Sequence, residues 1–458
     1  MKRYFILVSD IIIFFFSLAA ALAIRNGSFS QSLFWDHTLP FSVILIFWLI
    51  VLYSFNLYDL SSLTNSLAFF NNVFKSLLIN VGISVFFFYL TPQLKITPKT
   101  ILVLHALIFF VLFGIFRYLT NIYLGLSHKK KTLCIGSVLH FEDIAHELSA
   151  NPQLGYEIAV LIDNDLDHES HKTVSDIFRE KYHIQIFPNF SDLKGIIETE
   201  HIDTVIVEPA LYDSRKIIQA LYECLPYQIQ IVSLTTFSEN ILKKIPLEAT
   251  SQTWLLENIA GGKNVAYDTF KKVADVFCGF LGLVVLGILL PFIAAAVKWE
   301  DGGNVLYMQT RVGKNGKLFP IIKFRTMRQD AEKNGPQWAG DNDPRITKVG
   351  RILRRTRLDE FPQVINILQG EMSVVGPRAE RPEYYQLFIE KIPYYKERLL
   401  ILPGLTGWAQ VNYPYAASLE ENSKKLQYDL YYLKNKSILL DCATILKTIS
   451  IVLRGMGK

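Results

Sequence analysis

Long apolar runs separated by short polar segments dominate the first third of the chain. Four of these runs approach the ~20 residues that a helix needs to cross the hydrocarbon core of a bilayer. They are Tyr4–Ile24, Leu39–Leu57, Leu77–Leu94 and Thr100–Tyr123. The first run lacks a small-residue cleavage site and is followed by further apolar runs, so it indicates a retained anchor rather than a signal peptide. The pattern predicts four transmembrane helices within residues 1–127.

Basic residues in the loops between these runs predict an orientation. Lys75 lies between the second and third runs, and Lys129–Lys131 follow the fourth, whereas the opposite loops hold Arg25, Lys95 and Lys99. Lysine and arginine concentrate in cytoplasmic loops. We therefore expect the amino terminus and everything after the fourth run to lie in the cytoplasm.

Residues 128–250 show a different pattern, in which short apolar runs alternate with amphipathic stretches. Two of the stretches, Phe141–Leu148 and Ser214–Leu225, are typical of helices. The short runs are typical of buried strands and are Lys131–Gly136, Ile158–Ile162, Thr204–Val207 and Ile229–Ser233. This alternation predicts a parallel sheet of Rossmann-like type.

The predicted sheet lacks the signature of a dinucleotide site. Gly136 is not followed by a second and third glycine at the GxGxxG spacing. Asp163, at the end of the second strand, is a candidate ribose ligand or a strand-end cap. We predict that this domain binds no dinucleotide with useful affinity and serves structural or regulatory ends.

A fifth apolar run opens the third unit, residues 251–458. Val276–Val297 is free of charge and long enough to span a membrane. Pro291 lies inside it, where a proline removes a helix hydrogen bond and kinks the chain, and Lys271 and Lys298 flank it. The sequence favours a re-entrant helix over residues 273–297 that enters the membrane, breaks at Pro291 and returns. A fifth transmembrane helix is the alternative.

Composition agrees with a membrane protein and excludes several other classes. Half of the residues are hydrophobic and 13% are aromatic. A net charge of +5 is small for 458 residues and argues against a dedicated nucleic-acid binder. The 4 cysteines form no CxxC pair, which argues against a disulfide framework and a cysteine zinc site.

The densest group of charged residues is the stretch Arg351–Gln363, RILRRTRLDEFPQ. Apolar residues follow at helical spacing, and Pro362 is tolerated only in a first turn, so a helix should begin near Asp359. Asp359 and Glu360 would then lie at a helix start, beside arginines that should lower the pKa of Asp359. An acid pair among cations is typical of phosphoryl transfer, with magnesium on the carboxylates and arginines on the phosphate oxygens. A capping acid within an ion-pair network is the alternative.

Two glycine-containing strings follow this stretch. They are Ser373–Arg378 (SVVGPR) and Pro403–Val411 (PGLTGWAQV). Glycine permits close approach of the backbone to a ligand. Trp408 in the second string is a candidate for stacking on a base or for packing in a core.

Four strings, in order and spacing, resemble the bacterial sugar transferases, or monotopic phosphoglycosyl transferases. The resemblance is closest to the large polyprenyl-phosphate hexose-1-phosphate branch of the exopolysaccharide type. The strings are QTRVGKNGKLFPIIKFRTM, DPRITKVGRILRRTRLDEFPQ, GEMSVVGPRAERPE and LPGLTGWAQV. The resemblance implies an N-terminal four-helix transmembrane bundle, a Rossmann-like α/β middle domain and a mainly α monotopic catalytic domain with a re-entrant helix.

The resemblance also implies roles for individual residues. Asp359 matches the nucleophile and Glu360 its partner acid, and both match ligands of Mg²⁺. Arg354 and Arg378 match arginines that bind the phosphates and nucleotide of the substrate. Two further matches, whose individual roles the resemblance does not assign, are the basic site residues Lys323 and Arg325.

The implied reaction transfers a hexose-1-phosphate, glucose first and galactose next, from a UDP-sugar to undecaprenyl phosphate. UMP is released through a covalent aspartyl-phosphosugar, and the product initiates an exopolysaccharide or capsule repeat unit. The implied partners are the lipid bilayer and a second copy of the chain, with no nucleic acid. The implied location is the bacterial inner membrane, with the middle and catalytic domains facing the cytoplasm.

Two other functions stay open from the sequence. One is a membrane-tethered NAD-dependent UDP-sugar epimerase or dehydratase, which the missing GxGxxG string disfavours. The other is a non-enzymatic regulator of polysaccharide assembly, for which Asp359 would be dispensable.

Overall fold

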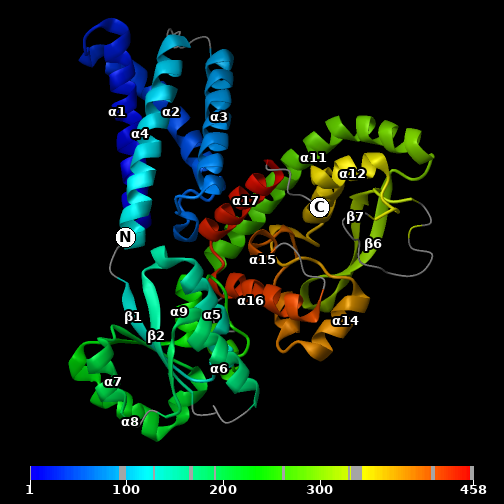
Figure 1. Ribbon diagram of the computed structural model, residues 1–458. Coiled ribbons are helices and arrows are strands. Elements are labelled where there is room, and N and C mark those ends of the chain that lie inside the picture. Colours follow the sequence, from blue (N-terminus) through cyan, green and yellow to red (C-terminus); the bar gives the residue numbers. More distant parts are fainter. Residues whose placement is uncertain are drawn as a thin grey trace. The chain divides into compact units, whose positions relative to one another are not determined.

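The computed structural model describes residues 2–91, 99–126, 129–163, 169–189, 192–259, 264–328, 331, 343–413 and 418–453. The chain forms two compact units, Met1–Leu234 and Thr235–Lys458. Figure 1 labels their helices and strands. The predicted domain boundaries after residues 127 and 250 stay predictions.

Four long helices open the first unit. They are α1 (Lys2–Asn26), α2 (Gln31–Ser54), α3 (Leu67–Leu90) and α4 (Lys99–Leu126). Each is long and apolar enough to cross a membrane. Helices α2 and α3 begin earlier than the apolar runs because their early turns include polar residues, which a hydropathy pattern leaves out. Ser66 caps α3 by accepting from the Phe69 N–H at 3.2 Å. The predicted end of the third span at Leu94, and Lys95, lie outside the described residues.

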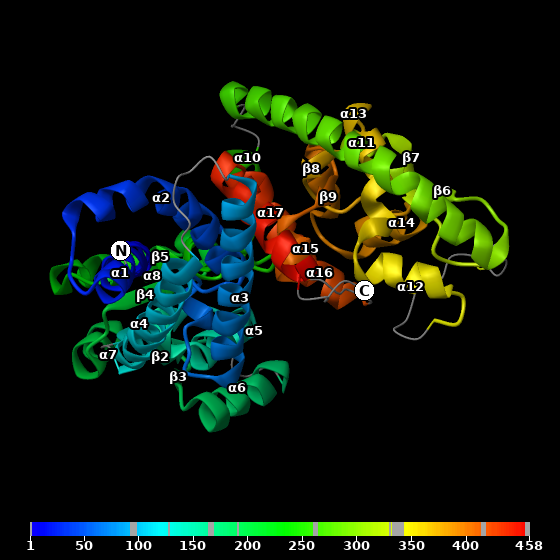
Figure 2. The same ribbon diagram turned by 90° about the horizontal axis from the view of Figure 1, so that it is seen from above.

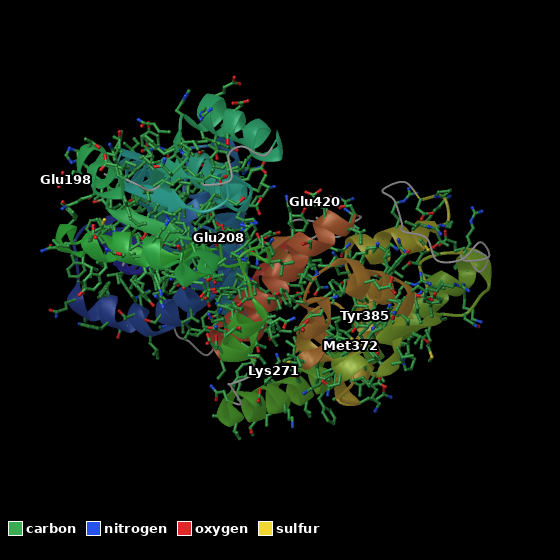
Figure 3. All side chains as sticks on the ribbon, turned by 90° about the horizontal axis from the view of Figure 1, so that it is seen from below. Glu198, Glu208, Lys271, Met372, Tyr385 and Glu420 are labelled. Carbon is green, nitrogen blue, oxygen red and sulfur yellow. The ribbon has the colours of Figure 1, made fainter. Side chains whose placement is uncertain are left out.

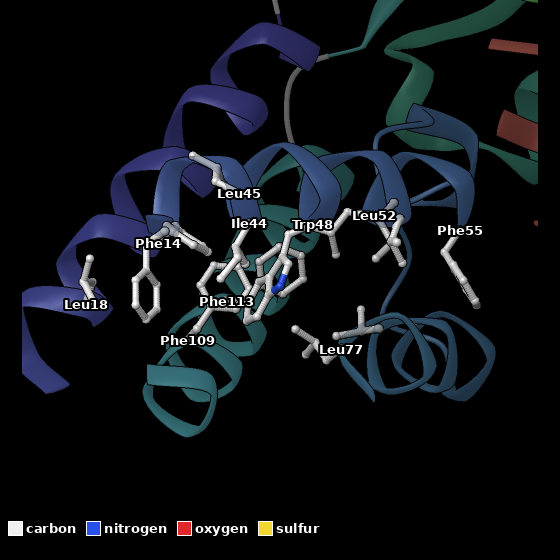
Figure 4. Close-up of a cluster of buried hydrophobic side chains, with 14 of the residues drawn as sticks. Phe14, Leu18, Ile44, Leu45, Trp48, Leu52, Phe55, Leu77, Phe109 and Phe113 are labelled. Carbon is white, nitrogen blue, oxygen red and sulfur yellow. The ribbon is translucent and has the colours of Figure 1, made fainter. Parts of the chain in front are cut away.

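These four helices share a core rich in aromatic rings (Figure 4). Trp48 of α2 is fully buried, with the rings of Phe14 and Phe109 at 5.3 and 5.0 Å from it. Arg117 of α4 and Asp10 of α1 form a fully buried ion pair with an N–O distance of 2.6 Å. The shared core fits the predicted four-helix bundle, whose placement in a membrane stays a prediction.

A five-stranded sheet follows in the same unit. All strand pairs are parallel and the order is β3-β2-β1-β4-β5, which is the order of the first five strands of the classic doubly wound fold. The strands are β1 (Lys130–Ile135), β2 (Tyr156–Ile162), β3 (Gln185–Phe187), β4 (Thr204–Val207) and β5 (Gln230–Ser233). The helices are α5 (Val138–Ala150), α6 (Glu169–Tyr182), α7 (Leu193–Glu200) and α8 (Arg215–Glu223). The predicted parallel sheet is confirmed; β3 escaped prediction because it is only three residues long.

The second unit is mainly helical, with two small sheets. Strands β6 (Leu306–Val312) and β7 (Leu318–Phe324) pair antiparallel, and β8 (Ser373–Val375) and β9 (Gly404–Thr406) pair parallel. The helices are α9 (Leu234–Ile241), α10 (Gln252–Asn258), α11 (Val265–Asp301), α12 (Lys348–Arg355), α13 (Val364–Leu368), α14 (Pro382–Lys391), α15 (Trp408–Asn412), α16 (Leu419–Asn435) and α17 (Ile438–Leu453). The unit also contains the 3₁₀ helices η6 (Leu358–Gln363) and η7 (Tyr395–Leu400).

Helix α11 contains the fifth apolar run and is the fifth candidate membrane span. Pro291 lies inside one continuous helix rather than at its end. The helix curves along its length (Figure 1). The predicted break at Pro291 is not confirmed, because the helix continues through this residue, and the re-entrant path through a membrane stays a prediction.

One face of α11 packs along the rest of the second unit (Figure 2). Gly279 and Gly282 lie so close to α13 that a Cβ atom on either would come within 2.8 Å and 2.6 Å of its side chains. Asp275 accepts from the Val374 N–H at 2.8 Å, and Glu300, near the other end, accepts from the Lys348 N–H at 2.6 Å. The opposite face exposes large apolar side chains, among them Val273, Phe277, Phe280, Val284 and Phe292.

Candidate active site

The predicted acid pair lies at the start of a short helical segment. Arg357 has a φ of 58°, and this left-handed residue turns the chain from α12 into η6. Asp359 and Glu360 occupy the first turn of η6, which leads into α13. The prediction of a helical start near Asp359 is confirmed, although Leu358–Gln363 is 3₁₀ rather than α-helical.

Glu360 is buried at the centre of a group of cations. Lys323, at the end of β7, donates to Glu360 Oε1 at 2.8 Å. Arg378 NH1 lies 3.5 Å from the same oxygen, and Arg357 NH1 lies 3.6 Å from Oε2. Burial opposes ionisation, but these three cations outweigh it and hold the pKa of Glu360 well below its usual range. Glu360 therefore carries a negative charge that gathers the cations.

Asp359 differs from its neighbour. Its Oδ1 atom is enclosed and has no hydrogen-bond partner among the described residues. Burial and the charge of Glu360 raise the pKa of Asp359, opposed by Lys323, Arg354 and Arg357. The predicted lowering of this pKa is therefore wrong, because burial of the carboxyl group and the neighbouring charge of Glu360 outweigh the attraction of the cations.

Two further predicted residues lie at the edge of this group. Arg354, at the end of α12, donates from Nε to Thr326 Oγ1 at 2.9 Å. Burial lowers the pKa of Arg354, opposed by the charge of Asp359. Arg325 follows β7, is buried, and donates its backbone N–H to Val305 O at 2.9 Å. The role of Arg325 in the site stays a prediction.

Arg311 on β6 is a cation of this region that sequence reasoning did not select. Its NH1 donates to Ala379 O at 3.1 Å, next to Arg378, and its NH2 donates to Gln309 Oε1 at 2.7 Å. Burial and the charge of Arg378 lower the pKa of Arg311 to about 10. The QTRVGKNG string, which contains Arg311, was the sequence feature that could have identified it as a site residue.

Glycines of the two strings let backbone segments pack closely. A Cβ on Gly404 would lie 2.0 Å from the backbone nitrogen of Gly376, and one on Gly407 would lie 2.2 Å from the Gly376 oxygen. These glycines let two backbone segments meet where β8 pairs with β9. Trp408 is buried, and its Nε1 donates to Lys243 O at 3.1 Å. The core-packing alternative for Trp408 fits, and the expected close approach of glycine to a ligand stays a prediction.

The predicted magnesium ligands fit a metal ion unequally. Among the residues that the structure describes, no group of three or more His, Cys, Asp or Glu side chains could hold a metal ion. Glu360 has both carboxylate oxygens beside cations of the protein. Asp359 Oδ1 has no described partner, and Mg²⁺ commonly uses one or two carboxylates together with substrate phosphates. Asp359 thus fits an Mg²⁺ ion, and Glu360 as a second ligand fits less well.

The start of α5 in the first unit is a second candidate site, because a doubly wound sheet binds phosphate there. Asp163 Oδ2 accepts from the Val138 N–H at 2.9 Å, and Glu208 Oε2 accepts from the Ser137 N–H at 3.0 Å. A Cβ on Gly136 would lie 2.5 Å from Glu208. Two carboxylates of the protein therefore occupy the place of a phosphate, and the capping alternative for Asp163 fits (Figure 3 labels Glu208).

Two family models match this chain. The model described as bacterial sugar transferase matches residues 266–455, which include all residues of the second unit's candidate site. The model described as CoA-binding domain matches residues 53–234.

Several curated proteins are similar to it. A UDP-N-acetylgalactosamine-undecaprenyl-phosphate N-acetylgalactosaminephosphotransferase of Aeromonas hydrophila is 36% identical over 239 residues, which cover 52% of this chain and 55% of that protein. An uncharacterized sugar transferase of Haemophilus influenzae is 30% identical over 382 residues, or 76% of this chain and 74% of that protein. A UDP-glucose:undecaprenyl-phosphate glucose-1-phosphate transferase of Escherichia coli is 39% identical over 181 residues, 39% of each chain.

The match to the Haemophilus sugar transferase extends over most of both chains. The match to the Aeromonas protein spans only about half of its length. The acid pair and its cations lie within the region that the sugar transferase model matches. The resemblance predicted from the sequence is confirmed, and this chain belongs to the bacterial sugar transferase family and is a transferase enzyme.

Proposed function

We propose that this enzyme transfers a hexose-1-phosphate from a UDP-hexose to undecaprenyl phosphate and releases UMP, as the first step of a surface polysaccharide. The names of the Aeromonas and Escherichia relatives support the acceptor and the class of donor. The observation that carries the proposal is the enclosed Asp359 Oδ1, which has no described partner, beside the cations gathered by Glu360. The relatives differ in the sugar they name, and we propose glucose first.

The chemistry proceeds by two displacements at one phosphorus atom. An oxygen of Asp359 attacks the β-phosphorus of the donor, and the bond to the bridging oxygen breaks, so that UMP leaves with the electron pair. The aspartyl phosphosugar is then attacked by a phosphate oxygen of undecaprenyl phosphate. The second displacement frees the carboxylate and yields undecaprenyl diphosphosugar.

The cations stabilise the charge on the phosphoryl group. Lys323 and Arg378 already meet at Glu360 Oε1, so their positions are set before the donor arrives. Arg354 lies near enough to Asp359 to affect its electrostatics. An Mg²⁺ ion held by Asp359 would offset further negative charge on the diphosphate.

The contacts of α11 support a catalytic domain that sits against one side of the membrane. Asp275 and Glu300, near opposite ends of the apolar run, both bond to backbone N–H groups of the second unit. A helix held along its length by one soluble unit fits a re-entrant or interfacial path better than a crossing. We propose that this unit faces the cytoplasm at the inner membrane; a homodimer stays a prediction.

Cysteine labelling tests this orientation. Cysteines placed at Lys271 and at Lys298, both outside the apolar run, should react with a membrane-impermeant reagent only from the cytoplasmic side (Figure 3 labels Lys271). Labelling at Lys298 from the periplasmic side would contradict the re-entrant or interfacial path and show that α11 crosses the membrane.

UMP release tests the activity itself. Detergent-purified protein is incubated with undecaprenyl phosphate and, separately, with UDP-glucose, UDP-galactose and UDP-N-acetylgalactosamine. We expect UMP release with at least one donor and strongest release with UDP-glucose. Release with none of them, from protein that is folded, would contradict the proposal; a requirement for NAD would favour an epimerase or dehydratase.

A further inference from the structure

A buried network of charges lies behind Arg378, outside the residues placed in the site above. Arg398 of η7 is 2% exposed. Its NH2 donates to the backbone oxygen of Arg378 at 3.0 Å and lies 2.9 Å from Asp429 Oδ2. Its NH1 donates to the Tyr395 hydroxyl at 2.7 Å and lies 3.6 Å from Glu380 Oε1. One guanidinium therefore joins η7 and α16 to the segment that carries Arg378.

The backbone of residues 378–380 is held from two sides. Its first carbonyl accepts from Arg398, and the next two accept from Arg311 NH1 at 3.1 Å and from the Val312 N–H at 2.9 Å. The side chain of Arg378, the first residue of this segment, donates to Glu360 at a donor–acceptor distance of 3.5 Å. That distance is at the outer limit of a hydrogen bond, so a small shift of the backbone would break it.

We infer that Arg398 is a positioning residue, which fixes the backbone of Arg378 so that its guanidinium meets Glu360 and the diphosphate of the donor. The inference rests on the proposed function. Arg398 touches none of the reacting atoms and acts through Arg378. Asp429, itself buried in α16, holds Arg398 in turn.

The alternative is that Arg398 only stabilises the fold. A lysine separates the two roles, because it keeps the positive charge but lacks the planar fork that bonds to both sides at once. Arg398→Lys should leave much of the buried pairing with Asp429 in place and loosen the bond to the Arg378 carbonyl. A positioning role then appears as lost activity in protein that is still folded.

A double-mutant cycle with Arg378→Ala measures this. The kcat and KM for UDP-glucose are determined with undecaprenyl phosphate and radiolabelled donor, so that slow turnover stays measurable. We expect Arg398→Lys to lower kcat/KM by about tenfold to a hundredfold in the wild-type background. In the Arg378→Ala background the same change should cost less than about twofold, because the group it positions is absent.

Glu239→Gln is the matched control. Glu239 accepts from Lys434, in the last turn of α16, at 2.7 Å, so the variant also breaks an ion pair of that helix. It should lower the unfolding temperature and leave kcat/KM per folded molecule unchanged.

A second variant keeps the test decisive if Arg398→Lys does not fold. Asp429→Asn removes the charge that holds Arg398 but leaves the bond to the Arg378 carbonyl possible, and should cost less than Arg398→Lys. Equal losses in the wild-type and Arg378→Ala backgrounds would overturn the positioning role. Absence of UMP release by folded wild-type protein with every UDP-hexose tested would instead overturn the proposed function, and this inference with it.

Discussion

Carboxylates gather at the start of a helical segment in both units of this protein, with opposite results. At α5, Asp163 and Glu208 accept from backbone N–H groups, and the other Glu208 oxygen lies 2.9 Å from His140 Nδ1. At η6, Glu360 is engaged by cations, while an oxygen of Asp359 has no described partner. The first arrangement is closed by the protein's own groups. The second leaves an acid beside fixed cations, which is what phosphoryl transfer needs.

The largest difference between these two places should appear when one aspartate in each is changed to asparagine. Asp359→Asn keeps the shape but removes the nucleophilic charge, so turnover should fall by at least about a thousandfold. Asp163→Asn keeps an oxygen that can accept from Val138, and turnover should stay within about twofold. UMP release per folded molecule measures both. A similar loss of turnover in the two variants would contradict the functional difference between the η6 and α5 carboxylates.

Removing the charge of Glu360 should harm both stability and activity. Glu360→Gln leaves Lys323, Arg357 and Arg378 without their shared carboxylate, and loss of one partner of a buried ion group costs about 3–5 kcal/mol. Because the pKa of Glu360 is depressed, this stabilisation is present above about pH 4.3 and is lost as pH falls through the depressed pKa. Unfolding in detergent at neutral pH measures it. A variant as stable as the wild type would mean that the cations do not depend on Glu360.

The pH dependence of activity should report Asp359. Burial and the charge of Glu360 raise its pKa above the ordinary aspartate value of about 3.9. The carboxylate must be ionised to attack, so kcat/KM should fall as pH decreases through this raised pKa, before an ordinary aspartate would be protonated. The acidic limb of the profile should therefore lie higher than about pH 4. A profile flat down to that pH, in protein shown to be folded, would argue that Asp359 ionises as a solvent-exposed acid does.

The smallest effect on turnover is expected at the start of α5, where the protein's own groups occupy the backbone N–H groups. Glu208→Gln weakens the contacts to Ser137 and His140, and stability should fall by about 1–3 kcal/mol. Turnover should not change, and calorimetry should detect no micromolar binding of NAD or coenzyme A by the wild-type protein. Micromolar binding of either would show that the start of α5 can bind a phosphate group, and would contradict the difference drawn between α5 and η6.

Local patterns were enough to predict much of this molecule. The apolar runs predicted the long helices, and alternating short runs predicted four of the five strands of the parallel sheet. The acid pair at a helical start was also predictable, because Pro362 and the apolar spacing after it depend only on neighbouring residues. Contacts between distant residues were not predictable from such patterns.

The pKa of Asp359 shows why. Its neighbours in sequence are arginines, which predict a lowered pKa. Its burial, however, depends on how distant segments pack around it, and burial with the charge of Glu360 raises the pKa instead. Arg398 gave no signal at all, since its partners Asp429 and Arg378 lie far from it in sequence. The close approach of Gly376 to Gly404 was likewise not predictable, because it joins two segments that are distant in the sequence.

The most direct measurement of the central claim omits the lipid acceptor. Wild-type enzyme with UDP-glucose alone should exchange labelled UMP into UDP-glucose, and the peptide that contains Asp359 should gain the mass of one hexose phosphate. Asp359→Asn should show neither. If exchange strictly requires undecaprenyl phosphate, and no adduct forms on that peptide while turnover proceeds with the lipid, then transfer is direct and Asp359 is not the nucleophile.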